Sequence, residues 1–262
     1  MRLKNEDVLD LINRWLLGRL DSSSCAGFVV GVSGGIDSAL TSTLAALTGK
    51  PLLALNLPIN QETGQYSRSN EQIDWLKEKF PNTEATEVDL TDSFNSFITS
   101  FCDDTITNLA LVNSASRLRM AALYAYANSK NYMVVGTGNK VEDYGIGFFT
   151  KYGDGGVDIS PIADLLKSEV YELASFLNIP DSIQTATPTD GLWEDNRSDE
   201  DQIGASYDEL EWALQFHDSG FSEVTLSEEK KRVLEIYRSR HYTTKHKLEV
   251  PPVCKIPNYM KE

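Results

Sequence analysis

Apolar residues follow two different spacings along the chain. Short runs of consecutive apolar residues end at glycine or polar positions, which is typical of buried strands, and longer segments carry an apolar residue every three or four positions, as amphipathic helices do. The first spacing predicts strands at 28–32, 52–57, 86–90 and 133–137. The second predicts helices at 8–16, 38–47, 67–80, 91–101, 113–129, 167–177, 206–216 and 226–239.

The order of these elements predicts the class of fold. Strands alternate with helices as far as residue 137, and such units form right-handed crossovers between parallel strands. We therefore expect an α/β fold, a doubly wound parallel sheet flanked by helices, in a single domain over residues 1–262. Residues 138–156 are too irregular for one helix, and 181–201 have the composition of a loop. The connections 58–67 and 185–205 are longer than most, so each is either an active-site lid or a segment without fixed structure.

Composition and charge narrow the possible functions. The 262 residues carry a net charge of -15, which does not fit nucleic acid as the main partner. A small anionic ligand still fits, because backbone N–H groups bind phosphate on an acidic protein. The N-terminus lacks the pattern of a signal peptide, and no apolar run is long enough for a membrane span. Cys25, Cys102 and Cys254 have no metal-binding or disulfide spacing, so we expect free thiols in a cytoplasmic protein.

The strongest chemical signal is the segment Gly31-Val32-Ser33-Gly34-Gly35-Ile36-Asp37-Ser38, between a predicted strand and a predicted helix. Glycine lets the backbone approach an anion closely, and the helix N-terminus supplies free N–H groups. The segment therefore predicts a pyrophosphate site, although it is neither a Walker A loop nor the G-x-G-x-x-G fingerprint. Asp37 would repel phosphates unless a divalent cation lay between them, so it is a candidate magnesium ligand. The alternative is a glycine-rich turn in which Asp37 and Ser38 only cap a helix.

This Ser-Gly-Gly-x-Asp-Ser loop resembles the signature of the N-type ATP pyrophosphatases, which split ATP between its α and β phosphates. A second segment narrows the resemblance to the NAD+ synthetase family. It comprises Gly136-Thr137-Gly138-Asn139-Lys140-Val141-Glu142, residues 147–156, Asp158, Pro161 and Lys167. The similarity continues through Pro188-Thr189, residues 199–204, Tyr207 and His246-Lys247. It covers nearly the whole chain, and it implies a fold of the adenine-nucleotide α-hydrolase type and a homodimer.

Sheet geometry predicts independently where the two segments meet. Ligands of a doubly wound sheet bind beyond the carboxyl ends of its strands. If the first and fourth predicted strands are neighbours, Asp37 and Glu142 face one cleft, where two carboxylates beside a triphosphate call for Mg2+ between them. Glu142 could instead be an ordinary acidic residue at the start of a helix.

The resemblance also implies roles for single residues. The implied ATP contacts are Gly31, Val32, Ser33, Gly34, Gly35, Ile36, Asp37, Ser38, Thr137, Lys167 and Thr189. The implied contacts with deamido-NAD+ are Arg117, Lys151, Asp158, His246 and Lys247. Asp37 and Glu142 are the implied metal ligands, and Asp37 and Lys167 the implied catalytic residues.

Some of these assignments have competitors. Arg119 competes with Arg117, and Phe148, Phe149 and Tyr152 are either core aromatics or stack on a nicotinate or adenine ring. The chain also departs from the family pattern at Leu248, where the family often has arginine, and in an extra residue within 143–147.

The implied activity is the ATP-dependent amidation of deamido-NAD+ (nicotinic acid adenine dinucleotide), the work of a carbon–nitrogen ligase. The nicotinate carboxylate would attack the α-phosphate of ATP, giving an adenylate and pyrophosphate, and ammonia would then displace AMP to give NAD+. The synthetase pattern starts near residue 30, so no glutaminase domain fits and we expect free ammonia as the nitrogen donor. One alternative is another ATP pyrophosphatase with a different acceptor. A second is a nucleotide-binding sensor, which would have no need of the two metal carboxylates.

Overall fold

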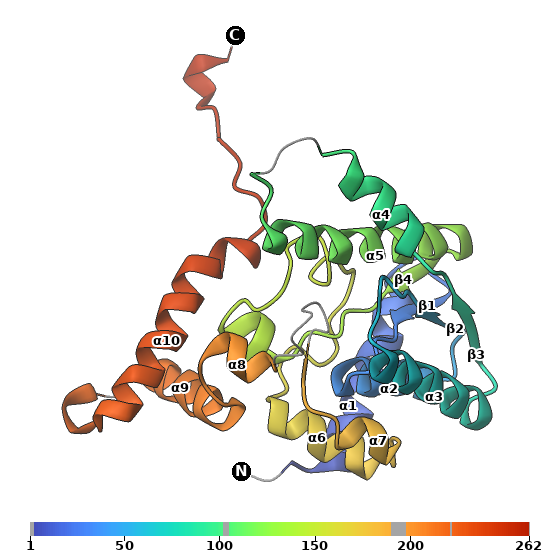
Figure 1. Cartoon of the computed structure of the whole chain (residues 1–262), viewed down its shortest axis with the longest axis horizontal. Coiled ribbons are helices and arrows are strands. Elements are labelled where there is room, and N and C mark those ends of the chain that lie inside the picture. The colour runs from blue at the N-terminus through green and yellow to red at the C-terminus, as the bar shows by residue number, and fades with distance from the viewer. Residues whose placement is uncertain (1–2, 102–104, 190–197, 221, 262) are drawn as a thin grey trace.

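The computed structural model describes residues 3–101, 105–189, 198–220 and 222–261. Within them, four parallel strands form one sheet in the order β3-β2-β1-β4 (Figure 1). These strands are β1 (Gly27–Gly31), β2 (Leu52–Asn56), β3 (Thr83–Glu87) and β4 (Tyr132–Val134). The change in strand order beside β1 is the switch point at which ligands of such sheets bind, and it lies between the two segments that the sequence singles out.

Helices cover both faces of this sheet. On one face lie α2 (Ile36–Leu47) and α3 (Thr63–Lys79), and α1 (Asn5–Asp21), α6 (Lys167–Phe176) and α7 (Asp181–Gln184) join α2 in the same core. On the other face lie α4 (Thr91–Thr99) and α5 (Asn108–Lys130). Alternate residues of β1 pack into the apolar cores on the two faces of the sheet: Phe28 and Val30 face α2, whereas Val29 faces α5.

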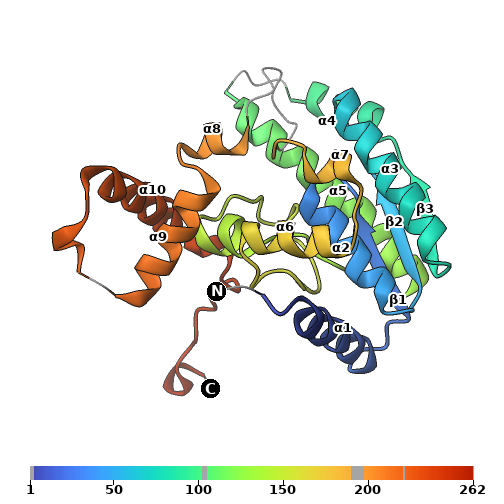
Figure 2. The same cartoon turned by 90° about the horizontal axis from the view of Figure 1, so that it is seen from below.

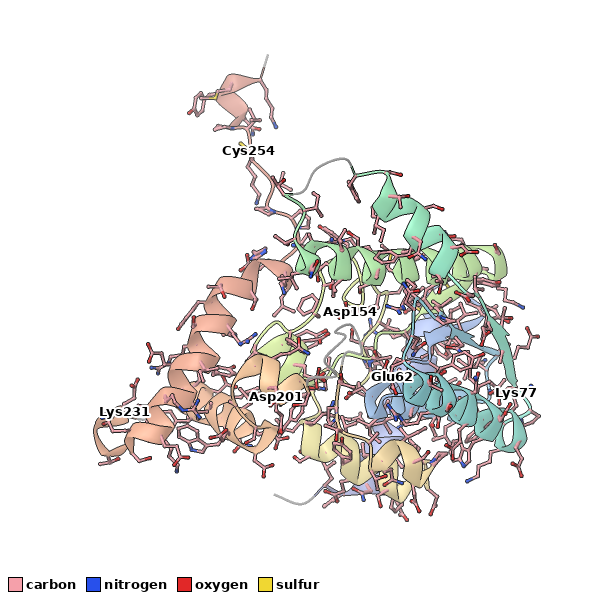
Figure 3. All side chains as sticks on the ribbon, viewed as in Figure 1. Glu62, Lys77, Asp154, Asp201, Lys231 and Cys254 are labelled. Carbon is pink, nitrogen blue, oxygen red and sulfur yellow. The ribbon has the colours of Figure 1, made fainter. Side chains whose placement is uncertain are left out.

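A second apolar cluster lies beside the sheet. It is formed by the π-helix η1 (Lys140–Gly145), α8 (Asp199–Ile203), α9 (Tyr207–Ser219) and α10 (Glu228–Thr244). Figures 1 and 2 show α6 between this cluster and the sheet. A short 3-10 turn, η2 (Glu223–Thr225), connects α9 to α10, and two more follow α10 at η3 (Lys245–Lys247) and η4 (Asn258–Met260). The described C-terminal residues project from the body and carry the exposed Cys254 (Figure 3).

The predicted class of fold is confirmed, and several boundaries are wrong. The third strand covers 83–87 instead of 86–90, because it is an edge strand whose polar residues hide the apolar pattern. The helix α3 begins four residues earlier than expected, where the carboxylate of Glu62 accepts from the N–H groups of Gly64 and Gln65. The helix α5 begins five residues earlier, capped by Thr107.

Residues 181–201 are also not the plain loop that the composition predicted. They contain α7 and the start of α8, whereas residues 190–197 and Cys102 lie outside the described part of the chain. Cys25 and Cys254 are free thiols, as expected. No helix among the described residues is both long enough and apolar enough to cross a membrane.

Candidate active site

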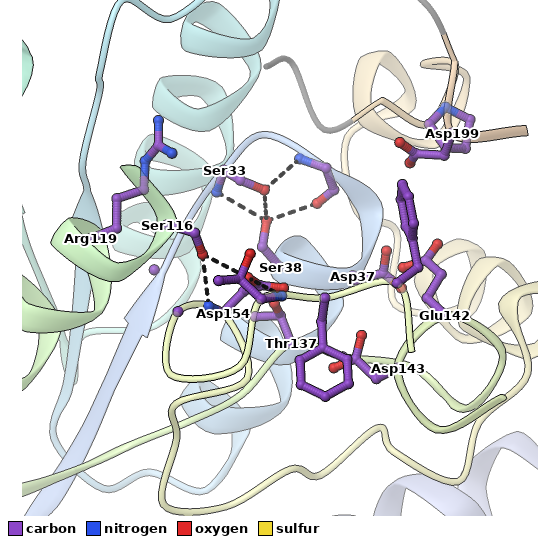
Figure 4. A pocket seen from close by; sticks show the side chains of 18 of the residues that line it. Ser33, Asp37, Ser38, Ser116, Arg119, Thr137, Glu142, Asp143, Asp154 and Asp199 are labelled. Atoms are coloured by element: carbon purple, nitrogen blue, oxygen red, sulfur yellow. Dashed lines mark hydrogen bonds between the residues drawn. The ribbon is translucent and has the colours of Figure 1, made fainter. Parts of the chain in front are cut away.

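The loop between β1 and α2 has the shape of an anion-binding turn. Gly34 has a φ of 85°, a left-handed conformation that favours glycine, and a Cβ there would lie 2.4 Å from the carbonyl oxygen of Gln65. The hydroxyls of Ser33 and Ser38 lie 3.1 Å apart, and the N–H groups of Ser33 and Gly35 donate to them (Figure 4). The first turn of α2 adds N–H groups that have no partner within the helix. This geometry suits a phosphate group.

Three charged side chains from separate segments meet beside the loop. Asp37 lies in the first turn of α2, Glu142 in η1, and Lys167 at the start of α6. The Nζ atom of Lys167 lies 2.6 Å from Oδ2 of Asp37 and 2.9 Å from Oε1 of Glu142. The side chain of Lys167 is 4% exposed, and those of Asp37 and Glu142 are 18% and 15% exposed. β1 and β4 are indeed neighbours, so the condition on which the sequence predicted this meeting of carboxylates is fulfilled.

Burial and charge act against each other in this cluster. Burial opposes the charge on Lys167, but Asp37 and Glu142 outweigh it, and the pKa of Lys167 lies above its ordinary value. Burial raises the pKa of Asp37, and although Lys167 lowers it, Glu142 adds to the increase. Lys167 therefore keeps its positive charge at neutral pH. Two converging carboxylates are a hard-oxygen donor set of the kind that Mg2+ prefers, so the residues present fit that ion.

A single buried amide connects η1 to this cluster. The Oδ1 atom of Asn139 accepts from the N–H groups of Val141 and Glu142 and so caps the π-helix. Its Nδ2 atom donates to Oδ1 of Asp37 at 3.1 Å. The wide turn that follows is closed by a bond from the N–H of Ile146 to the carbonyl of Val141. Asn139 therefore fixes the backbone at Glu142 and the side chain of Asp37.

Tyr207 holds Glu142 from the side of the second apolar cluster. Its hydroxyl donates to Oε1 of Glu142 at 2.5 Å, and Oδ2 of Asp199 lies 3.4 Å from the same hydroxyl. Burial, followed by the charges of Glu142 and Asp199, raises the pKa of Tyr207, so the phenol stays protonated and donates. The ring centroid also lies 5.0 Å from Nζ of Lys167, within the range of a cation–π contact.

Asp37, Glu142 and Lys167 line a cleft with a volume of about 550 Å³ at the carboxyl edge of the sheet. The residues with implied roles that line it are Gly31, Val32, Ser33, Gly34, Gly35, Ile36, Asp37, Ser38, Thr137, Glu142, Lys167, Thr189 and Lys247. Phe148 and Phe149 line it as well, whereas Tyr152 does not and is 53% exposed. The structure thus brings every implied ATP and metal residue to one cleft.

Four of the five implied dinucleotide contacts lie outside this lining. Arg117 is exposed and donates to the carbonyl of Lys151, whose ammonium in turn donates to the carbonyl of His246. These three residues form a chain on the surface next to Lys247, the fifth contact. The carboxylate of Asp158 accepts from the N–H of Val134 and from the hydroxyl of Tyr124, so it ties β4 to α5.

Several cleft residues are not among the contacts that the resemblance assigned. Arg119 lines the wall opposite Asp37 in the view of Figure 4, and its Nε donates to the carbonyl of Leu57 at 2.9 Å. Asp143 and Asp154 lie below the phosphate loop in the same view. Arg119 was a named competitor, but nothing in the sequence pattern could tell which of two arginines faces inward, since that depends on the rotation of α5.

Comparisons with known proteins show which family the chain resembles. A family model described as NAD synthase matches residues 8–251. The chain is 36% identical over 256 residues to the NH3-dependent NAD+ synthetase of Methanosarcina acetivorans, covering 95% of this chain and 97% of that protein. It is 38% identical over 214 residues to the enzyme of the same name from Mesoplasma florum, covering 80% and 84%.

Solved structures show the same fold. The NMN synthetase from Francisella tularensis superposes with a TM-score of 0.84 at 31% identity, covering 97% of this chain and all (100%) of that one. The NH3-dependent NAD synthetase from Campylobacter jejuni superposes with a TM-score of 0.79 at 26% identity and the same coverage. Both matches extend over the sheet and the second apolar cluster together.

Proposed function

Because the chain belongs to the NAD synthase family, we propose that the cleft amidates deamido-NAD+ with ammonia, using ATP and passing through an adenylate. One observation carries this proposal beyond the family match. Asp37 after β1 and Glu142 after β4 meet at Lys167 beside a preformed phosphate loop. That arrangement places opposed charges where the polyphosphate of ATP would lie.

The chemistry consists of two displacements. An oxygen of the nicotinate carboxylate attacks the α-phosphorus, the bond to the bridging oxygen breaks, and pyrophosphate leaves. The nitrogen of ammonia then attacks the acyl carbon, the bond to the AMP oxygen breaks, and a proton is released. Neither step needs a protein nucleophile, so the protein contributes position and charge. The phosphate loop would hold the leaving pyrophosphate, and Lys167 would neutralise the charge that develops on it.

Magnesium belongs to this proposal, with Asp37 and Glu142 as its ligands. When bound, the ion would supply charge neutralisation at the phosphates. Within the described residues no group of three or more acidic, histidine or cysteine side chains forms a metal site. Two protein carboxylates still suit Mg2+, which commonly takes its other ligands from water and substrate phosphates.

The acceptor would enter from the surface chain formed by Arg117, Lys151 and His246. We assign its anionic groups to Arg117, Lys151 and Lys247, its hydroxyl groups to Asp158 beside β4, and a further contact to His246. Lys247 already points its Nζ at the carbonyls of Gly147 and Phe149 on the cleft wall, at 2.8 and 2.7 Å. The similarity to an NMN synthetase also favours nicotinate mononucleotide as a second acceptor to be tested.

A cytoplasmic homodimer completes the proposal. Large apolar side chains on α4 and α5, which cover the same face of the sheet, support a subunit interface; examples are Phe97 (45% exposed) and Leu109 (57% exposed). Leu109 also lines the cleft, so a second subunit would lie near the site. Sedimentation velocity would test this assembly.

The decisive experiment is turnover by the purified protein. Deamido-NAD+ or nicotinate mononucleotide is incubated with ATP and Mg2+, with either ammonium or glutamine, and the amide product and AMP are quantified. We expect NAD+ and AMP in equal amounts with ammonium and not with glutamine. Asp37→Ala and Glu142→Ala should each lower kcat by about a hundredfold or more.

Two other outcomes would change the assignment. Faster turnover of the mononucleotide would make the chain an NMN synthetase. A folded protein that binds ATP and amidates neither acceptor would contradict the proposal and direct attention to other acids.

A further inference from the structure

The carboxylate oxygens of Asp37 and Glu142 differ in the hydrogen bonds that they accept. Both oxygens of Asp37 have donors, Oδ1 from Asn139 and Oδ2 from Lys167. Glu142 is different, because Lys167 and Tyr207 both donate to Oε1. Among the residues that the structure describes, no donor contacts Oε2 of Glu142.

This pattern decides what an incoming divalent cation must displace. The cation can reach Glu142 through Oε2 without disturbing Tyr207. It cannot reach Asp37 through Oδ2 while the ammonium of Lys167 lies 2.6 Å from that atom. Lys167 therefore competes with the cation for Asp37, whereas the hydrogen bond from Tyr207 to Glu142 can persist when the cation binds.

The alternative partners of Lys167 are few. Its side chain is 4% exposed, so water cannot replace the two carboxylates as it would at the surface. Without it, Asp37 and Glu142 would face each other in a largely shielded site. Like charges so placed repel strongly, and a resident cation removes that repulsion.

We propose that Lys167 is a resident counter-ion which a divalent cation displaces from Asp37, while the Tyr207 hydroxyl keeps Glu142 in place through the exchange. The inference rests on the proposed function, because that is what makes the two carboxylates metal ligands. Tyr207 acts through Glu142 and is a positioning residue. The exchange also frees the Lys167 ammonium when the cation arrives, so that it can contact the phosphates of the nucleotide.

The first test measures cation binding directly. Free Mn2+ is titrated by electron paramagnetic resonance in the absence of ATP, with wild-type protein and Lys167→Met. We expect the variant to bind Mn2+ roughly tenfold more tightly, because a competing positive charge has been removed. Lys130→Met is the matched control, since it removes a lysine paired with Glu84 on the surface and should leave the affinity unchanged. Lys167→Gln replaces Lys167→Met if circular dichroism shows that the methionine variant is unfolded.

The second test removes one hydroxyl. In the Lys167→Met background, Tyr207→Phe should weaken Mn2+ binding by about tenfold, the usual effect of losing an outer contact to a metal ligand. Tyr237→Phe is its control, because Tyr237 is buried in the same apolar cluster and no residue in the described part of the chain bonds to its hydroxyl. A purely structural role for Tyr207 would change the melting temperature and leave the Mn2+ affinity alone.

The outcomes separate this inference from the proposed function. If Lys167→Met binds Mn2+ no more tightly than the wild type, or Tyr207→Phe binds it equally well, the inference is overturned. Glu142→Gln in the Lys167→Met background tests the site itself. If that change leaves Mn2+ binding intact, the assignment of the metal ligands fails as well.

Discussion

At the scale of single residues, the guanidinium of Arg119 forms no ion pair within the described part of the protein. Arg119 lines the cleft, and burial lowers the pKa of its guanidinium, an effect that the charge of Asp154 offsets only in part. In the described structure no carboxylate lies within ion-pair distance of it. A partly buried cation with no carboxylate in direct contact is unfavourable until an anion arrives. A phosphate or carboxylate of a substrate would fill that role, with the bidentate geometry that arginine provides.

We therefore expect Arg119→Lys, which keeps the charge and loses the planar fork, to raise the KM of ATP or of the acceptor by about tenfold. Steady-state kinetics with each substrate varied in turn would measure this. Arg14→Lys, a surface change on α1 next to Asp10, should leave both KM values unchanged. Unaltered KM values in a stable Arg119→Lys protein would mean that the residue only supports the backbone at Leu57.

Asn139 gives a second prediction at this scale. Asn139→Asp keeps an oxygen that can cap η1, but it replaces the donor to Asp37 by a second carboxylate oxygen 3.1 Å away. We expect it to lower the free energy of unfolding by about 1–3 kcal/mol and to lower kcat as well. Urea unfolding and turnover would be measured together. Asn139→Ala loses both the cap and the donor and adds no charge, so it separates the effects: if both variants lose kcat equally, the lost hydrogen bond to Asp37 is what matters.

At the scale of elements, the β1–α2 loop depends on one backbone conformation. Gly34→Ala would combine a left-handed φ of 85° with a Cβ 2.4 Å from the Gln65 carbonyl. We expect a loss of about 1–3 kcal/mol in unfolding free energy and a marked fall in ATP affinity. Gly49 is an apt control because its φ is 71° and a Cβ there would meet no atom within 4 Å.

Thermal unfolding and ATP titration of the two alanine variants would check this. Gly49→Ala should lose some stability from its backbone conformation and keep its affinity for ATP. Equal ATP affinity in both variants would contradict the role of the loop as the phosphate site.

The same scale shows what the sequence could predict and what it could not. Buried strands such as β1 and β2 are continuous apolar runs, so their positions follow from the pattern. The edge strand β3 has the sequence TEATE, and only its pairing with β2 makes it a strand. The π-helix η1 has no periodic signature, and its wide turn depends on Asn139, a contact invisible in one dimension.

The site shows the same limit. The phosphate loop is local, so its residues could be named from their order along the chain. The surface residues Arg117 and Lys151 were named from resemblance alone, and the structure sets them beside the cleft lining instead of in it. Arg119 and Tyr207 act through contacts with residues 62 and 65 positions away, which no local pattern encodes.

At the scale of the whole molecule, the candidate site joins two separate apolar cores. Asp37 is anchored to the core between α2 and the sheet, whereas Glu142 and Tyr207 belong to the cluster of η1, α9 and α10. The carboxylate of Glu211 on α9 adds another connection, because it accepts from the N–H and hydroxyl of Ser168 on α6. A ligand that binds both Asp37 and Glu142 should therefore stabilise both apolar cores at once.

Hydrogen exchange would measure that coupling. With Mg2+ and ATP together, we expect slower exchange in η1 and α9 as well as in α2, because a ligand that binds only the native state raises the free energy of every opening that breaks its site. Chelation of the metal with ATP still present should remove most of the protection in η1 and α9, since ATP alone would be held by the phosphate loop. Asp37→Asn should behave like the chelated wild type. Protection confined to α2 under all conditions would mean that nucleotide binding does not engage the second core, and that Glu142 takes no part in holding the ligand.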